Sequence, residues 1–183
     1  MTCLDGAQGI VATAHPGAYT ARMVLVSLGS NLGDSAALVG AAVQALRGRA
    51  FADFRASALY RTAPVDCPPG SPDFVNAAVA FVARGEDSPE HLLIFLQALE
   101  REHGRRASAQ RNAPRSLDLD LILYNDETRN TASLTLPHPR ATLRRFVLQP
   151  AAAIAPELIW PGTRSTIGQL CAALGATGVD PAA

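Results

Sequence analysis

The most informative absence from this sequence is lysine. All 16 of the side chains in its lysine-plus-arginine total are arginines. A Walker-type phosphate loop requires a Gly-Lys-Ser/Thr motif and Schiff-base catalysis requires a lysine amine, so the sequence excludes both. If the protein binds phosphate, arginine must supply the positive charge, and its planar guanidinium suits phosphate oxygens.

Cysteine is scarce, and no metal-binding spacing is present. Cys3, Cys67 and Cys171 are odd in number and far apart, and the four histidines are scattered as well. These positions match neither a zinc site nor a disulfide framework. Such cysteine usage favours a reducing compartment, so we expect a cytoplasmic protein.

Excess charge and long apolar runs are also absent. The 16 acidic residues balance the 16 arginines, so no net field attracts nucleic acid or an anionic membrane. No apolar run reaches the roughly 18 residues that a membrane span requires. Because 48% of the 183 residues are hydrophobic, we expect one globular domain, acting as a monomer without nucleic-acid or membrane partners.

The two ends of the chain lack any periodic pattern. Residues 1–22 are rich in glycine, alanine and threonine, and lack the basic start and apolar core of a signal peptide. We predict a dispensable N-terminal extension at 1–22, a single domain at 23–175 and a tail at 176–183. Deleting the extension is expected to leave stability and activity nearly unchanged.

Strand and helix patterns alternate through the predicted domain. Apolar or alternating runs predict extended segments at 23–28, 51–61, 74–83 and 117–124. A capping residue at Asp34 or Ser35 begins one helix and Ser88 begins another, and further short helices follow around Arg144 and at 167–174. The order β-α-β-β-α-β predicts a ferredoxin-like α+β sandwich, an antiparallel sheet with helices packed on one face. That fold hosts many functions and selects none.

The strand predicted at 117–124 carries the strongest chemical signal. Alternation sends the leucines at 117, 119, 121 and 123 to one face. Asp118 and Asp120 share the opposite face, roughly 7 Å apart, and Ile122 and Tyr124 continue it. Two like charges in so apolar a strand are costly unless a cation lies between them, and carboxylate oxygens suit Mg²⁺. With Arg115 before the strand, the pattern points to phosphoryl chemistry on a nucleotide, although the pair could equally be the solvated face of an edge strand.

Other candidate residues have both a functional and a structural interpretation. Residues 29–33 resemble a phosphate loop only loosely, so a plain turn is favoured. Asn76 could satisfy neighbouring backbone or read the edge of a heterocycle. Phe74 and Phe146 could be core or clamp a flat ring, and His138 could donate to phosphate or shape a turn. Arginines gather around the carboxylate pair and favour an anion site: Arg105, Arg106, Arg111, Arg115, Arg144 and Arg145.

Several motifs together resemble one family. Arg111-x-Ala-Pro-Arg-x-x-Asp-Leu-Asp-Leu-Ile is similar to the signature of the 6-hydroxymethyl-7,8-dihydropterin pyrophosphokinases of the folate pathway. Further motifs occur in family order along residues 23–170: Gly29-Ser-Asn-Leu-Gly-Asp, Tyr60-Arg-Thr-x-Pro, Asp73-Phe-Val-Asn-Ala-Ala-Val, Leu99-Glu-x-x-x-Gly-Arg, Leu136-Pro-His-Pro-Arg, Arg145-Phe-Val-Leu-x-Pro and Ile154-Ala-Pro-Glu.

This resemblance implies an activity and a set of site residues. It implies transfer of pyrophosphate from ATP to the hydroxymethyl group of the pterin, with release of AMP. Asp118 and Asp120 would hold two Mg²⁺ ions, and with Arg105 and Arg115 they would be the catalytic residues. The implied ATP-binding residues are Gln97, Arg105, Arg115, Leu121, Thr135, His138 and Arg144. The implied pterin-binding residues are Thr62, Ala63, Val65, Phe74, Asn76 and Phe146.

The chain also departs from better-known members of the family. Loops at 62–72 and 105–115 correspond to segments that close over substrates, and the closing loop carries Ala107 and Asn112 where some members have arginine and tryptophan. Ala63 replaces a proline, and Phe74 a tyrosine. These differences bear on loop closure and ATP affinity rather than on the reaction. Two rivals remain from the residues alone: a Mg²⁺-dependent phosphohydrolase and a non-catalytic ferredoxin-like ligand-binding domain.

Overall fold

The structure is a computed structural model that describes residues 22–105, 113–175 and 180–181. The predictions for Arg106, Ala107, Arg111 and Asn112 lie outside these residues. Within the described parts of the chain, no helix is both long and apolar enough to cross a membrane.

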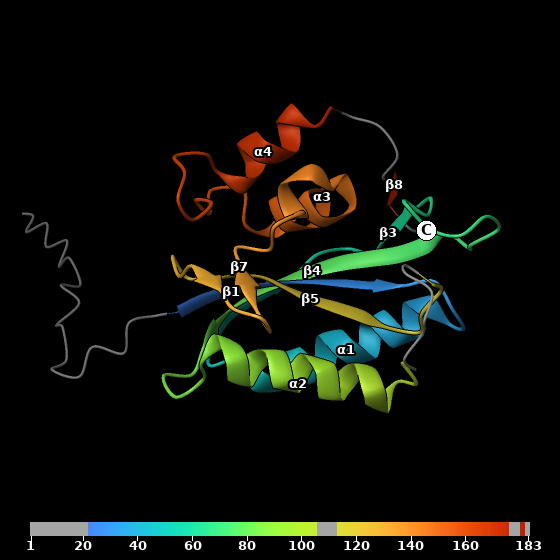
Figure 1. Ribbon diagram of the computed structural model, residues 1–183, viewed down its shortest axis with the longest axis horizontal. Helices are drawn as coiled ribbons and strands as arrows, with labels where there is room; N and C mark the ends of the chain where they lie inside the picture. Colours follow the sequence, from blue (N-terminus) through green and yellow to red (C-terminus); the bar gives the residue numbers. More distant parts are fainter. Residues whose placement is uncertain (1–21, 106–112, 176–179, 182–183) are drawn as a thin grey trace, which may run out of the picture.

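A six-stranded antiparallel sheet forms the centre of the molecule (Figure 1). Its strands are β1 (Arg22–Ser30), β2 (Ala52–Ala56), β3 (Tyr60–Thr62), β4 (Phe74–Ala83), β5 (Asp118–Tyr124) and β8 (Asp180–Pro181). They follow the order β5-β1-β4-β3-β8, and β2 also pairs with β4. A separate two-stranded sheet joins β6 (Arg129–Asn130) to β7 (Thr135–Leu136). The predicted α+β class and antiparallel sheet are confirmed.

Helices cover both faces of the sheet, not one as predicted. Figure 1 shows α1 (Ser35–Arg49) and α2 (Pro89–Glu102) below the sheet, with α3 (Arg145–Ile154) and α4 (Ile167–Ala173) above it. Each pair of helices packs into its own apolar core. The physical reason lies in the central strands: β1 and β4 are buried on both faces almost throughout, so each face needs a covering layer.

Local capping signals begin the two long helices where the sequence predicts. The Asp34 carboxylate accepts the N–H of Ala37 at the start of α1, and the Ser88 hydroxyl accepts the N–H of His91 at the start of α2. Pro89 occupies the first turn of α2, where its missing N–H costs no hydrogen bond. After α2 the chain turns through Gly104, whose φ of +84° favours glycine.

A bulge makes one part of the face prediction for β5 wrong. The pairing register of β1 with β5 shifts between Leu25, which pairs with Leu123, and Val26, which pairs with Leu121. Ile122 therefore has no pairing partner on β1 and is the inserted residue of the bulge. Up to Leu121 the leucines face the α1/α2 core as predicted. Beyond the bulge, Leu123 turns to the α3/α4 core and Tyr124 to the α1/α2 core, because an inserted residue reverses strand alternation.

The structure also refines the predicted boundaries. The segment predicted at 51–61 divides into β2 and β3. β1 begins at Arg22, within the predicted extension, and its guanidinium donates to the carbonyls of Gly85 and Asp87. At the other end, residues 180–181 of the predicted tail pair with β3.

Candidate active site

A pocket of about 230 Å³ opens on the α3 side of the sheet, where the end of β1 meets the starts of β4 and β5. Register explains the meeting, since Gly29 of β1 pairs with Asn76 of β4 and with Asp118 of β5. Its lining residues come from four strands, three loops and α3: Ser27, Gly29, Thr62, Ala63, Val65, Cys67, Phe74, Asn76, Arg105, Arg115, Asp118, Asp120, Arg140, Arg144 and Phe146. Every residue predicted to bind the pterin, and every one predicted to be catalytic, lines this pocket.

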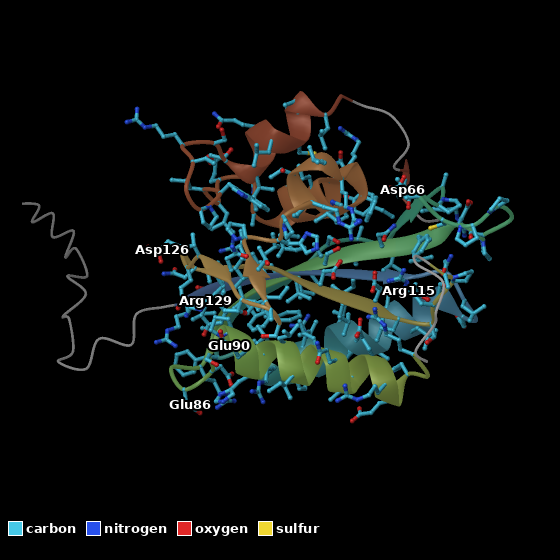
Figure 2. The ribbon with its side chains drawn as sticks, viewed as in Figure 1. Asp66, Glu86, Glu90, Arg115, Asp126 and Arg129 are labelled. Carbon is cyan, nitrogen blue, oxygen red and sulfur yellow. The ribbon has the colours of Figure 1, made fainter. Side chains whose placement is uncertain are left out.

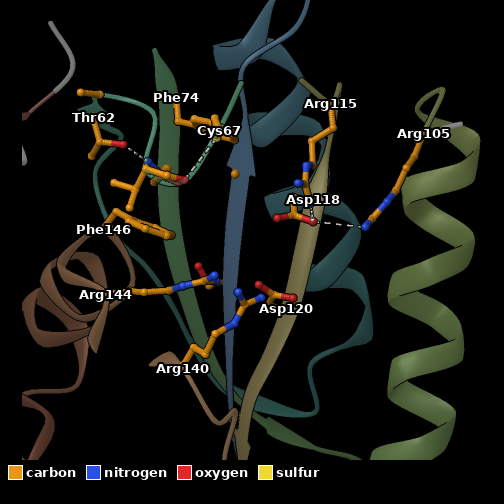
Figure 3. Close-up of a pocket in the computed structure, with 15 residues that line it drawn as sticks. Thr62, Cys67, Phe74, Arg105, Arg115, Asp118, Asp120, Arg140, Arg144 and Phe146 are labelled. Carbon is orange, nitrogen blue, oxygen red and sulfur yellow. Dashed lines mark hydrogen bonds and ion pairs between the residues drawn. The ribbon is translucent and has the colours of Figure 1, made fainter. Parts of the chain in front are cut away.

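The two aspartates of β5 lie in different electrostatic surroundings. Asp118 Oδ1 is 2.9 Å from Arg115 Nη1 and 3.1 Å from Arg105 Nη1 (Figure 3). No hydrogen bond or ion pair joins the Asp120 carboxylate to another described residue. Burial raises the pKa of Asp120 above its usual range, and the charge of Asp118 raises it further, against a lowering by His138 and Arg144. Asp120 therefore lines the pocket as a carboxylate that has no hydrogen-bond or ion-pair partner among the described residues.

This donor set fits Mg²⁺ bound together with a phosphate ligand. Among the described residues, no cluster of three or more His, Cys, Asp and Glu side chains could hold a metal alone. Mg²⁺ is usually held by one or two carboxylates plus substrate phosphates and waters. The unpartnered Asp120 beside Asp118 supplies that kind of partial site.

A second cavity, of about 470 Å³, lies between α2 and β5. Its lining residues are Leu93, Gln97, Glu100, Arg101, Arg105, Leu119 and Asp120. Two of them, Arg105 and Asp120, also line the first pocket. The two cavities therefore meet beside the carboxylates of β5.

Glu100, which the sequence reasoning did not select, lines the second cavity and pairs with Arg105, which lines both cavities. It is buried on α2, accepts the N–H of Leu119 at 2.8 Å and forms an ion pair with Arg105. Burial raises its pKa, although the Leu119 N–H and Arg105 oppose the shift. A charged residue three positions after Gln97 on the same helix was the available signal.

Three residues predicted to bind ATP line neither cavity. Leu121 is buried in the α1/α2 core and Thr135 is exposed on β7. His138 is held by its N–H, which donates to the Ile122 carbonyl at 2.8 Å. Burial lowers the pKa of His138, and its Nδ1 lies 3.3 Å from the N–H of Arg140. With Nδ1 accepting, the neutral ring carries its proton on Nε2, which is then a donor.

The residues predicted to bind the pterin divide into aromatic rings and hydrogen-bonding groups. Phe74 and Phe146 reach the pocket from β4 and α3, and the Arg144 guanidinium lies 5.4 Å from the Phe146 ring centroid (Figure 3). Asn76 is buried and its Nδ2 donates to the Thr62 hydroxyl at 2.8 Å. A side chain, not backbone, therefore satisfies its amide donor.

The sequence reasoning also missed Ser27, Gly29, Cys67 and Arg140 as lining residues. Gly29 has a clear physical role, since a Cβ there would come within 3.1 Å of Asn76 Oδ1 and 3.7 Å of the Phe74 ring. The contact with the Phe74 ring would be ordinary, but the one with Asn76 Oδ1 is tight, so glycine at this point leaves Asn76 undisturbed. Its position at the end of a buried strand was a signal, but its neighbours depend on strand pairing.

Comparison with known proteins gives a consistent result. A family model described as 7,8-dihydro-6-hydroxymethylpterin-pyrophosphokinase matches residues 25–156. A 2-amino-4-hydroxy-6-hydroxymethyldihydropteridine pyrophosphokinase from Synechocystis sp. is 41% identical over 129 residues, covering 70% of this chain and 64% of that protein. A protein of the same name from Porphyromonas gingivalis is 37% identical, covering 74% of this chain and 92% of the relative.

Some relatives are much longer than this chain. A folate synthesis bifunctional protein from Chlamydia caviae is 33% identical over 79% of this chain, which spans 33% of its length. A solved HPPK-DHPS structure in complex with substrates superposes with a TM-score of 0.62 at 12% identity, covering 84% of this chain and 43% of that one. At that identity the structural likeness supports the fold alone.

Proposed function

The chain belongs to the 7,8-dihydro-6-hydroxymethylpterin-pyrophosphokinase family, and from that premise we propose that it transfers pyrophosphate from ATP to 6-hydroxymethyl-7,8-dihydropterin. The reaction releases AMP and serves folate biosynthesis. The observation that carries the proposal is the junction of two cavities at Arg105 and Asp120. Transfer between two substrates requires their reacting atoms to be adjacent and in line, and a shared wall with charged side chains provides such a meeting point.

The cavity between α2 and β5 suits the nucleotide. Leu93 and Leu119 give it apolar walls, and Gln97 adds an amide that can hydrogen-bond a base. The triphosphate then extends toward the junction, where Arg105 and Arg115 offer guanidinium groups. His138, neutral with its proton on Nε2, is a further donor to phosphate. Leu121 and Thr135 remain predicted adenine-pocket residues by family position.

The first pocket suits a flat polar heterocycle. Phe74 and Phe146 provide ring faces on two sides. Asn76 donates its amide protons toward Thr62, so its Oδ1 is left as an acceptor for the ring edge. Ala63 and Val65 complete the wall of the pocket. They belong to the loop at residues 62–72, the proline-rich loop.

Asp118 and Asp120 hold two Mg²⁺ ions in this proposal. The unpartnered carboxylate of Asp120 and the like charge beside it support a cation here. Bound Mg²⁺ would neutralise phosphate charge as the bond to AMP breaks. In the structure Asp118 is shared by two guanidiniums, which can pass to phosphate oxygens when the carboxylate turns to metal.

The protein's own part in the chemistry is positioning and charge neutralisation. The pterin hydroxyl attacks the β-phosphorus of ATP, and no covalent enzyme intermediate is needed. Arg105 and Arg115 stabilise charge on the transferring group. The loop at 62–72, which lines the first pocket, closes over the substrates and excludes water, which limits ATP hydrolysis.

A product assay tests the proposal against both rivals. The protein is incubated with ATP, Mg²⁺ and 6-hydroxymethyl-7,8-dihydropterin, and nucleotides are separated by ion-exchange chromatography. Release of AMP that depends on the pterin is the expected result. Phosphate release without pterin would indicate a phosphohydrolase, and unchanged ATP would indicate a ligand-binding domain.

The proposal includes a monomer in the cytoplasm. The two cysteines among the described residues, Cys67 and Cys171, are free thiols, as expected in a reducing compartment. Light scattering of the purified protein gives its mass in solution, and a dimer would contradict the monomer.

A further inference from the structure

The motif Gly29-Ser-Asn-Leu-Gly-Asp contains a residue whose position the proposed activity does not by itself explain. Asn31 directly follows β1 and is only 3% exposed. Because β1 lies between β5 and β4 in the sheet, the end of β1 faces the entry segments of both neighbouring strands. Those segments supply the phosphate side and the pterin side of the site.

Toward β5, Asn31 holds the backbone of Arg115 at two points. The N–H of Asn31 donates to the Arg115 carbonyl at 3.2 Å, and the N–H of Arg115 donates to Asn31 Oδ1 at 2.9 Å. The Arg115 guanidinium then reaches Asp118 at 2.9 Å. Fixing both backbone groups limits where this guanidinium can lie.

Toward β4, the same side chain holds the end of the proline-rich loop. Asn31 Nδ2 donates to the Pro72 carbonyl at 3.2 Å. Pro72 lies two residues before Phe74, a ring that lines the pocket. The acceptor and the donor of one buried amide thus hold two segments 43 residues apart in sequence, as the positions of Pro72 and Arg115 show.

The turn that carries Asn31 is itself fixed. Gly33 takes a φ of +78°, Asp34 caps α1, and the hydroxyls of Ser30 and Ser35 are 3.0 Å apart. Because the turn is rigid, the Asn31 amide can fix the separation between Arg115 and Pro72 and does not simply move with them. Aspartate at this place would keep the acceptor and lose the donor, and alanine would lose both.

We infer that Asn31 is a positioning residue, which holds Arg115 and the Pro72 end of the loop at a fixed separation across the open end of β1. This inference rests on the proposed function, because it assigns the two segments to the two substrates. The motif at residues 29–34 then connects two substrate-binding segments, and is not a phosphate loop.

Replacement of Asn31 tests its contacts with both Arg115 and Pro72. Asn31→Ala is expected to lower turnover about tenfold, because small misplacement of an oriented group is costly to the reaction. Its dissociation constant for the pterin, measured without ATP, should rise several-fold. In an Arg115→Ala background the further loss of turnover on Asn31→Ala should shrink to under about threefold, since the group that it positions is gone.

Asn31→Asp separates the contact with Arg115 from the contact with Pro72. Amide hydrogen exchange measures both contacts independently of enzyme activity. The aspartate variant should keep the slow exchange of the Arg115 N–H, while exchange in residues 65–73 accelerates. Asn31→Ala should accelerate both. Thr166→Ala is the matched control: it removes one capping hydrogen bond of α4, lowers stability by a similar amount and should change none of these readouts.

Each result decides the inference. Wild-type turnover and pterin affinity in a folded Asn31→Ala protein would overturn it, and so would full additivity with Arg115→Ala. Lower melting temperature with unchanged turnover would reduce Asn31 to a structural residue. If the wild-type protein releases no AMP, the proposed function fails, but the exchange measurements still decide whether Asn31 holds both segments.

Discussion

Charged groups lie at both ends of the central sheet, but the two ends differ in how these charges are paired. Far from the site, the Asp87 carboxylate pairs with Arg49 at 2.5 Å, and its backbone carbonyl accepts the Tyr124 hydroxyl and Arg22. At the site, two guanidiniums share Asp118 and no described residue pairs with Asp120. Figure 2 shows Arg115 at the site end and the surface pair Glu90–Arg129 toward the other.

The contrast separates structural charge from functional charge. At the Asp87 end the carboxylate has an arginine partner and the backbone carbonyl has two donors, so the cluster joins β1, α1 and β5. At the Asp118 end the protein leaves charge incompletely matched, which costs stability and keeps oxygens available to a cation. Substitutions at the two ends should therefore affect different measurements.

Neutralising the site carboxylates should have the largest effect. Asp118→Asn and Asp120→Asn keep shape but remove charge from the metal site, so turnover should fall at least about a hundredfold, roughly 2.7 kcal/mol in the barrier. Asp120→Asn should hold or raise the melting temperature, because burial and Asp118 oppose its charge. Asp118→Asn also loses two arginine pairs, so its melting temperature should change less favourably. AMP release and melting temperature are compared over a Mg²⁺ titration. Full activity of either variant at low Mg²⁺ would contradict the assignment of Asp118 and Asp120 as Mg²⁺ ligands.

Breaking the opposite cluster should reverse that pattern. Asp87→Ala leaves Arg49 without its partner, and we expect a loss of about 2 kcal/mol of unfolding free energy, less than for a fully buried pair because Arg49 is partly exposed. Turnover at temperatures below the transition should stay at the wild-type level. Urea denaturation and the AMP assay measure the two quantities. A large loss of turnover in the folded variant would show that the two ends are not independent.

Within the site, Asn76 tests whether a polar group serves one substrate. Asn76→Ala removes the acceptor facing the pocket and the partner of Thr62, and should weaken pterin binding by about 1–3 kcal/mol. ATP binding should change much less. Calorimetric titration with each ligand measures both affinities. Equal losses for the two ligands would remove Asn76 from the pterin site.

Glu100 should show the cost of a buried charge in the pH dependence of stability. Burial raises its pKa above the ordinary value of 4.5, so the folded state holds its proton more tightly than the unfolded chain. Its contribution to stability is therefore present below pH 4.5 and is lost as pH rises through the raised pKa. Glu100→Gln removes this titration, so its stability relative to wild type should increase between acid and neutral pH. Turnover should fall a few-fold because Arg105 loses its ion-pair partner. A parallel pH dependence of the two proteins would contradict this.

The smallest effects concern the N-terminal segment. Deleting residues 1–21 should leave melting temperature and turnover unchanged. Deleting Arg22 as well removes its bonds to the carbonyls of Gly85 and Asp87, and should lower the melting temperature slightly. Thermal melts of the two truncations give the difference, and equal stabilities would mean that Arg22 contributes nothing measurable.

Prediction from sequence succeeded where the signal was local. The caps at Asp34 and Ser88 act through neighbours three residues away, and alternation up to Leu121 follows from strand geometry alone. It failed at Leu123, since the bulge arises from the pairing of β1 with β5. It missed Glu100 and Asn31 for a related reason: their partners lie 19 and 84 residues away.

The sequence alone determined the family and the α+β class, and it predicted the site residues and a dependence on arginine for anion binding. These follow from residue types and short-range spacing, which the unfolded chain already contains. The tertiary structure decided that helices cover both faces, that two arginines share Asp118 while no described residue pairs with Asp120, and that Asn31 contacts two loops. Those features depend on strand register and on contacts between distant segments, which exist only after the sheet has formed.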